Sequence, residues 1–209
     1  MNYIEALEKR YSVKKFDIEK KVAPEVLENI LEAGRLSASS LGLQPYKIYV
    51  IENPEILKRL QDAFYNPSQI TTCSHLIVIA AKRDIEEQYI DGYFRHISDV
   101  RNVTMQTLEG FRNSVMSFRD NIEKENLLHW NEKQAYIVLG NLMFAAALEN
   151  VDSSPMEGFR QEVIAETLGL DQVKEKVTVT LALGYRAEDD PFQKMKKVRK
   201  PGDKLFKYI

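Results

Sequence analysis

The chain has 209 residues, of which 44% are hydrophobic and 29% are charged, a composition that excludes disordered and fibrous classes. A formal net charge of -2 argues against a dedicated nucleic-acid binder, and no run of about 18 apolar residues predicts a membrane span. The opening MNYIEALEKR lacks the apolar region of a signal peptide and Cys73 is the single cysteine, so we expect a cytoplasmic protein without an intrachain disulfide.

The first half of the chain alternates helical and strand patterns. YKIYVIE is rich in β-branched and aromatic residues, which is typical of a strand, and the uninterrupted apolar run HLIVIAA predicts a strand that is buried on both faces. Strands separated by helices predict one domain, residues 1–209, in which helices cover both faces of a sheet. The predicted elements are helices at residues 2–10 and 24–36, a strand at 46–52, a helix at 54–64 and a strand at 75–81.

The second half contains one segment that stands out. Residues 134–148 are apolar around nearly the whole helical circumference, so we expect this helix to be buried on every side, with the help of a second subunit. Residues 86–125 are mostly charged and polar, which predicts one or two long exposed helices. The remaining predicted elements are a strand and turn at 151–155, a helix at 159–170 and the last core strand at 177–185.

Several common catalytic motifs are missing. The glycines form no G-x-G pair and no G-K-[ST] sequence, which argues against a dinucleotide-binding Rossmann domain and a P-loop enzyme. The three histidines have no local metal-ligand spacing, although a site assembled from distant residues stays open. No G-x-S-x-G marks a serine nucleophile, and Cys73 at the entry to an apolar strand is best interpreted as a packed core thiol.

Residues 37–50, SASSLGLQPYKIYV, place an unusual number of small and polar residues before the first strand. A turn from helix to strand needs about two or three such residues, and this stretch has at least five. The simple interpretation is a helix end followed by a turn. The surplus favours a second role for the loop.

Four separated segments resemble the FMN-dependent nitroreductase family: RYSVKKFD (10–17), SASSLGLQPYKIYVI (37–51), SSPMEGF (153–159) and KKVRKP (196–201). They occur in the family's order and span nearly the whole chain. The resemblance implies an α+β (α/β) nitroreductase-like fold with a central, mostly antiparallel mixed sheet flanked by helices. It also implies a domain-swapped homodimer, with FMN sites at the interface and a C-terminal extension, residues 186–209, that reaches the partner.

The resemblance gives the basic residues near both chain ends an anion to bind. A guanidinium group binds phosphate through paired, charge-assisted hydrogen bonds, and Arg10 would meet the tail cations on the FMN phosphate. Ser12 would bond ribityl or phosphate oxygens, and Lys14 would reach the ribityl chain or the pyrimidine edge of the ring. Each of these residues alone would be interpreted as part of a solvated helix end or a charged tail. The implied residues are Arg10, Tyr11, Ser12, Lys14, Lys197 and Arg199.

The loop before the first strand resembles the family segment that reaches the flavin of the neighbouring subunit. Ala38, Ser39 and Ser40 would lie against the cofactor, where small side chains allow close approach. Some relatives carry Asn where this chain has Gly42, so only a backbone contact can remain there. Gln134 matches another cofactor-side position.

Two further segments match the parts of the family site that face the flavin ring. Asn66 matches an amide on the pyrimidine edge, and Gln69 stands where several relatives have Lys, so we expect a lower flavin potential. In the turn SSPMEGF, the backbone N–H of Glu157 would bond flavin N5 and Gly158 would permit close approach. The residues implied in this turn are Pro155, Met156, Glu157 and Gly158.

The resemblance implies a two-electron, ping-pong reaction in which NAD(P)H delivers hydride through flavin N5 and a nitroaromatic, quinone or flavin then takes it. No metal is implied. Residues 105–130 would set substrate choice, with Phe118 or Phe111 as a possible lid. Three alternatives stay open: different flavin chemistry on the same fold (dehalogenation, flavin fragmentation or azoline oxidation), a flavin-binding redox sensor without turnover, and an interaction module without cofactor.

Overall fold

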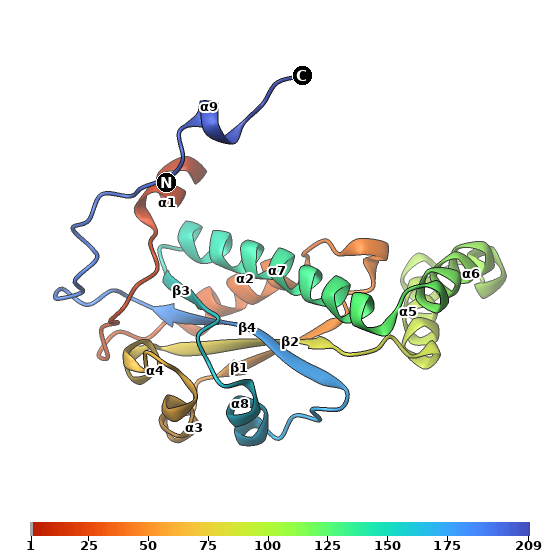
Figure 1. Cartoon of the computed structure of the whole chain (residues 1–209), viewed down its shortest axis with the longest axis horizontal. Coiled ribbons are helices and arrows are strands. Elements are labelled where there is room, and N and C mark those ends of the chain that lie inside the picture. The colour runs from red at the N-terminus through yellow and green to blue at the C-terminus, as the bar shows by residue number, and fades with distance from the viewer. Residues whose placement is uncertain (1) are drawn as a thin grey trace.

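The computed structural model describes residues 2–209 (Figure 1). Helices and strands alternate along most of the chain, as the sequence predicted. In chain order the elements are α1 (Tyr3–Lys9), α2 (Pro24–Arg35), the 3-10 turn η1 (Ser40–Gly42), β1 (Tyr46–Ile51), α3 (Pro54–Leu60), the 3-10 turn η2 (Gln61–Ala63), α4 (Ser68–Thr72), β2 (His75–Lys82), α5 (Glu87–Arg101), α6 (Met105–Asn121), α7 (Lys124–Leu148), β3 (Asp152–Met156), α8 (Gln161–Leu168), β4 (Glu175–Gly184) and α9 (Gly202–Leu205).

The four strands form one sheet in the order β1-β2-β4-β3, and each neighbouring pair is antiparallel. β2 occupies an interior position, which explains its uninterrupted apolar sequence, because both of its faces are covered. A register shift between Ile79 and Ala80 marks a bulge in its pairing with β4. The edge strand β1 starts opposite the end of β2, with Tyr46 paired to Ala81.

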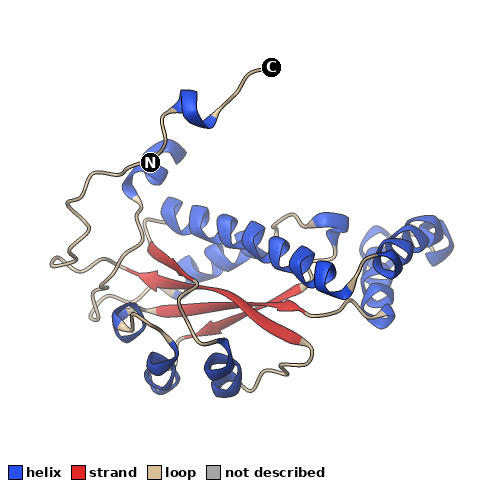
Figure 2. Ribbon diagram, viewed as in Figure 1, coloured by secondary structure: helices blue, strands red, loops and turns tan. Residues whose placement is uncertain are grey.

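Helices cover both faces of the sheet, as predicted (Figure 2). Because strand side chains alternate between faces, Ile77 and Ile79 of β2 pack with the cluster under α2 and α7, while Leu76 and Val78 pack with α3, α4 and α8. Helices on both faces of a single antiparallel sheet agree with the predicted α+β fold class.

The segment predicted as one or two exposed helices is the hairpin of α5 and α6, which has its own small core. Ile90 and Phe94 of α5 pack with Leu108 and Val115 of α6 in a hydrophobic cluster that is separate from the clusters on the two faces of the sheet. The hairpin projects from one end of the sheet (Figure 1).

The apolar helix is longer than predicted and is buried on one side only within this chain. α7 starts at Lys124, and residues such as Val138 and Leu142 are fully buried against the sheet and α2. Its opposite face leaves Tyr136 and Ile137 exposed by 41% and 45%. This chain does not cover the remaining face, whose burial was predicted with the help of a second subunit.

The C-terminal tail leaves the sheet after β4, passes α1 and extends away from the body (Figure 1). Leu205, Phe206 and Tyr208 have exposed side chains. Among the helices of residues 2–209, we find none with the length and apolar character needed to span a bilayer.

Candidate functional site

Residues 10–16 form an extended segment that is tied to the end of the sheet where β3 begins. Ser12 forms an isolated parallel bridge with Ser153, and Phe16 forms an antiparallel bridge with Arg186. The N–H of Ala187 donates to the carbonyl of Lys15 at 3.0 Å. Backbone pairing thus fixes this segment against β3 and the start of the tail.

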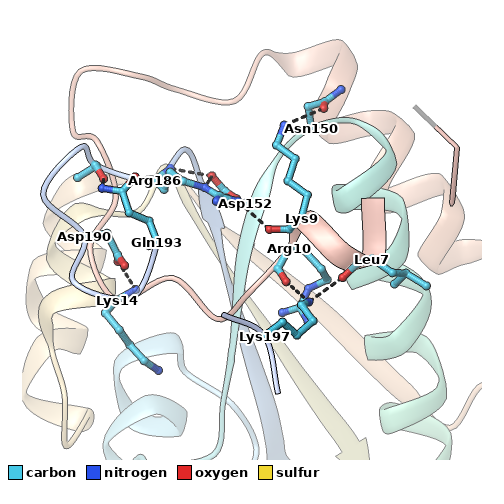
Figure 3. A network of polar contacts seen from close by, with 11 residues as sticks. Leu7, Lys9, Arg10, Lys14, Asn150, Asp152, Arg186, Asp190, Gln193 and Lys197 are labelled. Carbon is cyan, nitrogen blue, oxygen red and sulfur yellow. Dashed lines mark hydrogen bonds and ion pairs between the residues drawn. The ribbon is translucent and has the colours of Figure 1, made fainter. Parts of the chain in front are cut away.

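The basic residues from the two chain ends meet at a cavity of about 450 Å³, whose lining includes Arg10, Ser12, Lys14, Lys197 and Arg199. Lys197 Nζ donates to the carbonyl of Leu7 at 2.7 Å and also to that of Arg10, which brings the tail onto the C-terminal end of α1 (Figure 3). The structure therefore brings together the cations that the sequence grouped.

Arg10 lacks a partner for part of its guanidinium group. Its Nε and Nη2 atoms are buried and find no hydrogen-bond partner among residues 2–209. The nearby carboxylate of Asp152 is bound instead by Arg186, whose Nε lies 3.0 and 3.1 Å from its two oxygens. A buried, unpaired guanidinium is costly, and an anion from outside the chain could pair with it.

Electrostatics support the same conclusion. Burial, and then the positive charge of Arg199, lower the pKa of Arg10. Burial, and then Arg199 and Arg10, likewise lower the pKa of Lys197. Three cations that repel one another in the free protein would gain from a dianionic phosphate, and the donor set fits such a group.

The Asn66 loop adjoins the extended N-terminal segment. Ser68 Oγ donates to the carbonyl of Lys14 at 2.6 Å and lies 3.1 Å from Asn66 Oδ1. Gln69 is 3% exposed, and its Nε2 donates to Ser154 Oγ at 3.4 Å, whereas its Oε1 is buried without a partner in the described chain. A buried amide oxygen without a partner is uncommon and calls for an explanation.

The turn after β3 lies against the same loop. The N–H of Tyr65 donates to the carbonyl of Gly158 at 3.0 Å, and a side chain at Gly158 would lie 3.3 Å from the Tyr65 ring. Pro155 and Met156 belong to β3, so Glu157 is the first residue beyond the ladder. Burial, and then the neighbouring Glu157 carboxylate, raise the pKa of Tyr136 to about 12.

The loop before β1 is held by a dense set of side-chain hydrogen bonds. Ser39 Oγ accepts from the N–H of Gln44 at 2.9 Å, and Gln134 Oε1 accepts from the N–H of Ser40 at 2.8 Å. Gln44 Nε2 donates to the carbonyls of Arg35 and Ser37, and Tyr89 Oη donates to those of Leu43 and Gln44. The surplus of polar residues thus fastens a loop of unusual shape, while Ala38 stays exposed.

That shape is strained. Leu41 and Gln44 have φ values of 58° and 44°, in the left-handed region that residues other than Gly seldom adopt. Gly42, with φ of 73°, is required here, because an added Cβ would lie 2.2 Å from the hydroxyl of Tyr93. Strain of this kind concentrates at ligand sites.

A single chain does not bring all the predicted residues together. The basic cluster lies beyond the start of β2, next to Ser153 and Arg186, whereas the loop of residues 37–44 leads into β1 beyond the end of β2 (Figure 1). The eight residues of β2 alone span roughly 25 Å. Phe118 packs on Trp130, with ring centroids 5.0 Å apart, and Phe111 packs on Phe94, so both side chains have partners within the α5–α7 region.

Comparisons with known proteins find a matching family model and similar relatives. A family model described as "Nitroreductase family" matches residues 7–185. Two relatives carry the name "Putative NAD(P)H nitroreductase". One, from Staphylococcus haemolyticus, is 36% identical over 99% of this chain and 96% of that protein. The other, YfkO of Bacillus subtilis, is 37% identical over 89% of each.

A solved structure extends the likeness to the fold. A protein from Exiguobacterium sibiricum described as a "putative nitroreductase", crystallised in complex with FMN, superposes with a TM-score of 0.85 at 21% identity, over 100% of this chain and 98% of that one. At this identity the match establishes the fold of the present chain and nothing finer.

Proposed function

Because the chain belongs to the nitroreductase family, we propose that it is an FMN-dependent oxidoreductase that uses NAD(P)H to reduce nitroaromatics, quinones or flavins. One observation supports this most directly: the buried Arg10 guanidinium has unpaired donors and lies with Lys197 and Arg199 at one cavity. When bound, FMN would supply the hydride-transfer chemistry that the side chains lack.

The residues around this cavity would divide the binding of FMN among them. Arg10, Lys197 and Arg199 would hold the phosphate, and Ser12 and Lys14 would lie along the ribityl chain. Cations that are fixed at one end of an elongated ligand also orient its other end. Arg10, Lys197 and Arg199, which we call the phosphate clamp, would therefore determine where the flavin ring lies.

The ring end would be held by the Asn66 loop and the turn after β3. Asn66 and Gln69 offer amide groups to the pyrimidine edge, and the unpaired Oε1 of Gln69 would gain the acceptor role that it lacks in the free protein. The N–H of Glu157, just beyond the sheet ladder, would donate to N5, with Gly158 allowing close approach. Gln69 carries no charge, so we expect a lower flavin potential than in a Gln69→Lys variant.

We propose that the working unit is a homodimer with FMN at its interface. The loop of residues 37–44 lies at the other end of the sheet from the basic cluster, so it would reach the FMN of the partner subunit. The exposed apolar face of α7, which includes Tyr136, Ile137 and Leu148, would supply contact area between the subunits.

The C-terminal tail would complete this dimer. β1 is an edge strand, and its alternate residues Tyr46, Ile48 and Val50 line a groove of about 720 Å³. The exposed residues 206–209, which follow α9, would add to this edge on the partner, because backbone pairing and the apolar Phe206 and Tyr208 suit it. Deleting 201–209 spares Lys197 and Arg199, so we expect dimer loss in ultracentrifugation; a stable dimer would contradict this. Deleting 192–209 should also remove FMN.

The test of the activity is steady-state oxidation of NADH and NADPH by the FMN-loaded protein, with a quinone and a nitroaromatic as acceptors. Turnover that depends on both substrates, with parallel double-reciprocal plots, would support the proposal. Bound FMN without turnover would favour the redox-sensor alternative or different flavin chemistry. A protein that takes up no FMN would favour an interaction module.

A further inference from the structure

A buried carboxylate joins the two chain segments that carry the proposed phosphate ligands. Asp190 lies in the tail, seven residues before Lys197, and is 2% exposed. Its Oδ2 accepts hydrogen bonds from the backbone N–H of Lys14, at 2.7 Å (Figure 3), and from that of Lys15, at 2.8 Å, and its Oδ1 accepts one from the N–H of Phe192 at 2.9 Å. Burying a charge is costly without such bonds, so these three donors are what keep it there.

The three amides act together on the Asp190 carboxyl group. Burial alone would raise its pKa, but the N–H groups of Phe192, Lys15 and Lys14 more than offset that and hold the pKa below its usual value. The group is therefore a carboxylate at neutral pH, and it stays a pure acceptor for the amides that it binds.

This carboxylate determines how the peptide at Lys14 is oriented. The N–H of Lys14 is held by Asp190 on one side, and its carbonyl is held by Ser68 Oγ at 2.6 Å on the other. The Lys14 ammonium lies 5.8 Å above the ring of Phe192, whose own N–H binds the same carboxylate. The Asp190 side chain thus fixes the main chain of Lys14, a proposed cofactor ligand, and that of Phe192, whose ring lies beside the Lys14 ammonium.

We propose that Asp190 is a positioning residue for the phosphate clamp, which holds residues 10–14 in register with the tail that carries Lys197 and Arg199. This inference rests on the proposed FMN site. Besides the Asp190 bonds, the N–H of Ala187 to the carbonyl of Lys15 joins the same two segments. The bonds of Lys197 Nζ to the carbonyls of Leu7 and Arg10 join them as well, so losing the carboxylate would shift the main chain of residues 10–14 relative to the tail without separating the two segments.

The direction in which FMN affinity changes when Asp190 is replaced distinguishes a positioning role from a purely electrostatic one. Removing a negative charge near a bound phosphate would by itself strengthen binding. Asp190→Asn is therefore expected to weaken FMN binding only if geometry dominates. A matched control is available in Asp189, whose side chain is 68% exposed and pairs with the Lys15 ammonium, so Asp189→Asn makes the same charge change without touching the backbone.

The experiment measures the affinity of the full-length apoprotein for FMN and for riboflavin, which lacks the phosphate, in the wild type and in both variants. For Asp190→Asn we expect FMN binding to weaken about 10-fold or more, and riboflavin binding to weaken less than about threefold. Asp189→Asn should leave both affinities near the wild-type values. A purely structural role would weaken both ligands equally.

Each result then has one meaning. Equal losses for the two ligands, or unchanged FMN affinity in Asp190→Asn, would overturn the inference while the proposed function stands. A wild-type protein that binds no FMN would overturn the proposed function and this inference with it. Should Asp190→Asn fail to fold, Asp190→Glu keeps the charge but moves it by one methylene. The same comparison then decides: a larger loss for FMN than for riboflavin supports the inference, and equal losses overturn it.

Discussion

Replacing Arg10 with Met should change FMN affinity and apoprotein stability in opposite directions. Two guanidinium nitrogens, Nε and Nη2, are buried without partners among residues 2–209, and burial already lowers the pKa of this group. Met keeps much of the apolar stem while removing the charge. The apoprotein should then lose a desolvation penalty of about 1 kcal/mol, which raises Tm by about 2–4 °C for a chain of this size.

The loss in binding follows from the same atoms. A hydrogen bond to a charged group contributes about 1.5–3 kcal/mol, which corresponds to roughly a 10- to 150-fold increase in Kd for FMN. Flavin fluorescence quenching measures Kd, and thermal unfolding of the apoprotein gives Tm. Lys174→Met is the matched control, because Lys174 is exposed, lies outside the lining of this cavity and has no side-chain hydrogen bond or ion pair in the described chain. Equal Kd values for the two variants, or a less stable Arg10→Met apoprotein, would refute the reasoning.

Three further predictions concern other parts of the molecule. Gly42→Ala should destabilise the fold by about 1–2 kcal/mol because of its left-handed backbone, and the contact with Tyr93 should add to this loss. Gly110→Ala, in open space on α6, should stabilise the fold by about 0.5–1 kcal/mol. Denaturant unfolding that ranked the two variants the other way would contradict this prediction. Burial raises the pKa of the Cys73 thiol to about 12. At pH 8, iodoacetamide should therefore label this thiol on the order of a thousandfold more slowly in the native protein than in the unfolded protein. Similar labelling rates in the two states would disprove its burial. The pKa of Lys197 lies below 10.5 in the free protein, so FMN affinity should fall as the pH rises through that pKa and the ammonium loses its charge. Lys197→Arg should move this fall to higher pH, because the guanidinium stays charged. Identical pH profiles for the two proteins would count against a role of Lys197 in FMN binding.

The local sequence patterns were sufficient to predict most elements, whereas the fold class followed from the resemblance of four separated segments to the nitroreductase family. The apolar run HLIVIAA is an interior strand, and the change from alternation to helical periodicity marks the helices that cover it. The burial predicted for α7 on every side was tied to a second subunit and stays a prediction, because one chain buries only one face of the helix.

The long-range contacts of the site could not be predicted from these patterns. Asp190 and Lys14 are 176 positions apart, and nothing in the stretch EDDP indicates which acid is buried. Gln134 is one polar position on an apolar helix, and only the fold shows that its amide holds Ser40. The second role that the surplus of small residues in residues 37–44 favoured stays a prediction. The bonds of Gln44 and Tyr89 that hold this loop depend on tertiary packing.

The most direct test of the proposed activity is anaerobic stopped-flow spectroscopy on the FMN-reconstituted protein. The account predicts one FMN per chain and loss of the oxidised-flavin absorbance near 450 nm within about a second of mixing with NADH or NADPH, at a rate compatible with ordinary turnover. Flavin that binds but keeps its absorbance for minutes with both nucleotides would contradict the central claim that this protein is an NAD(P)H-dependent oxidoreductase.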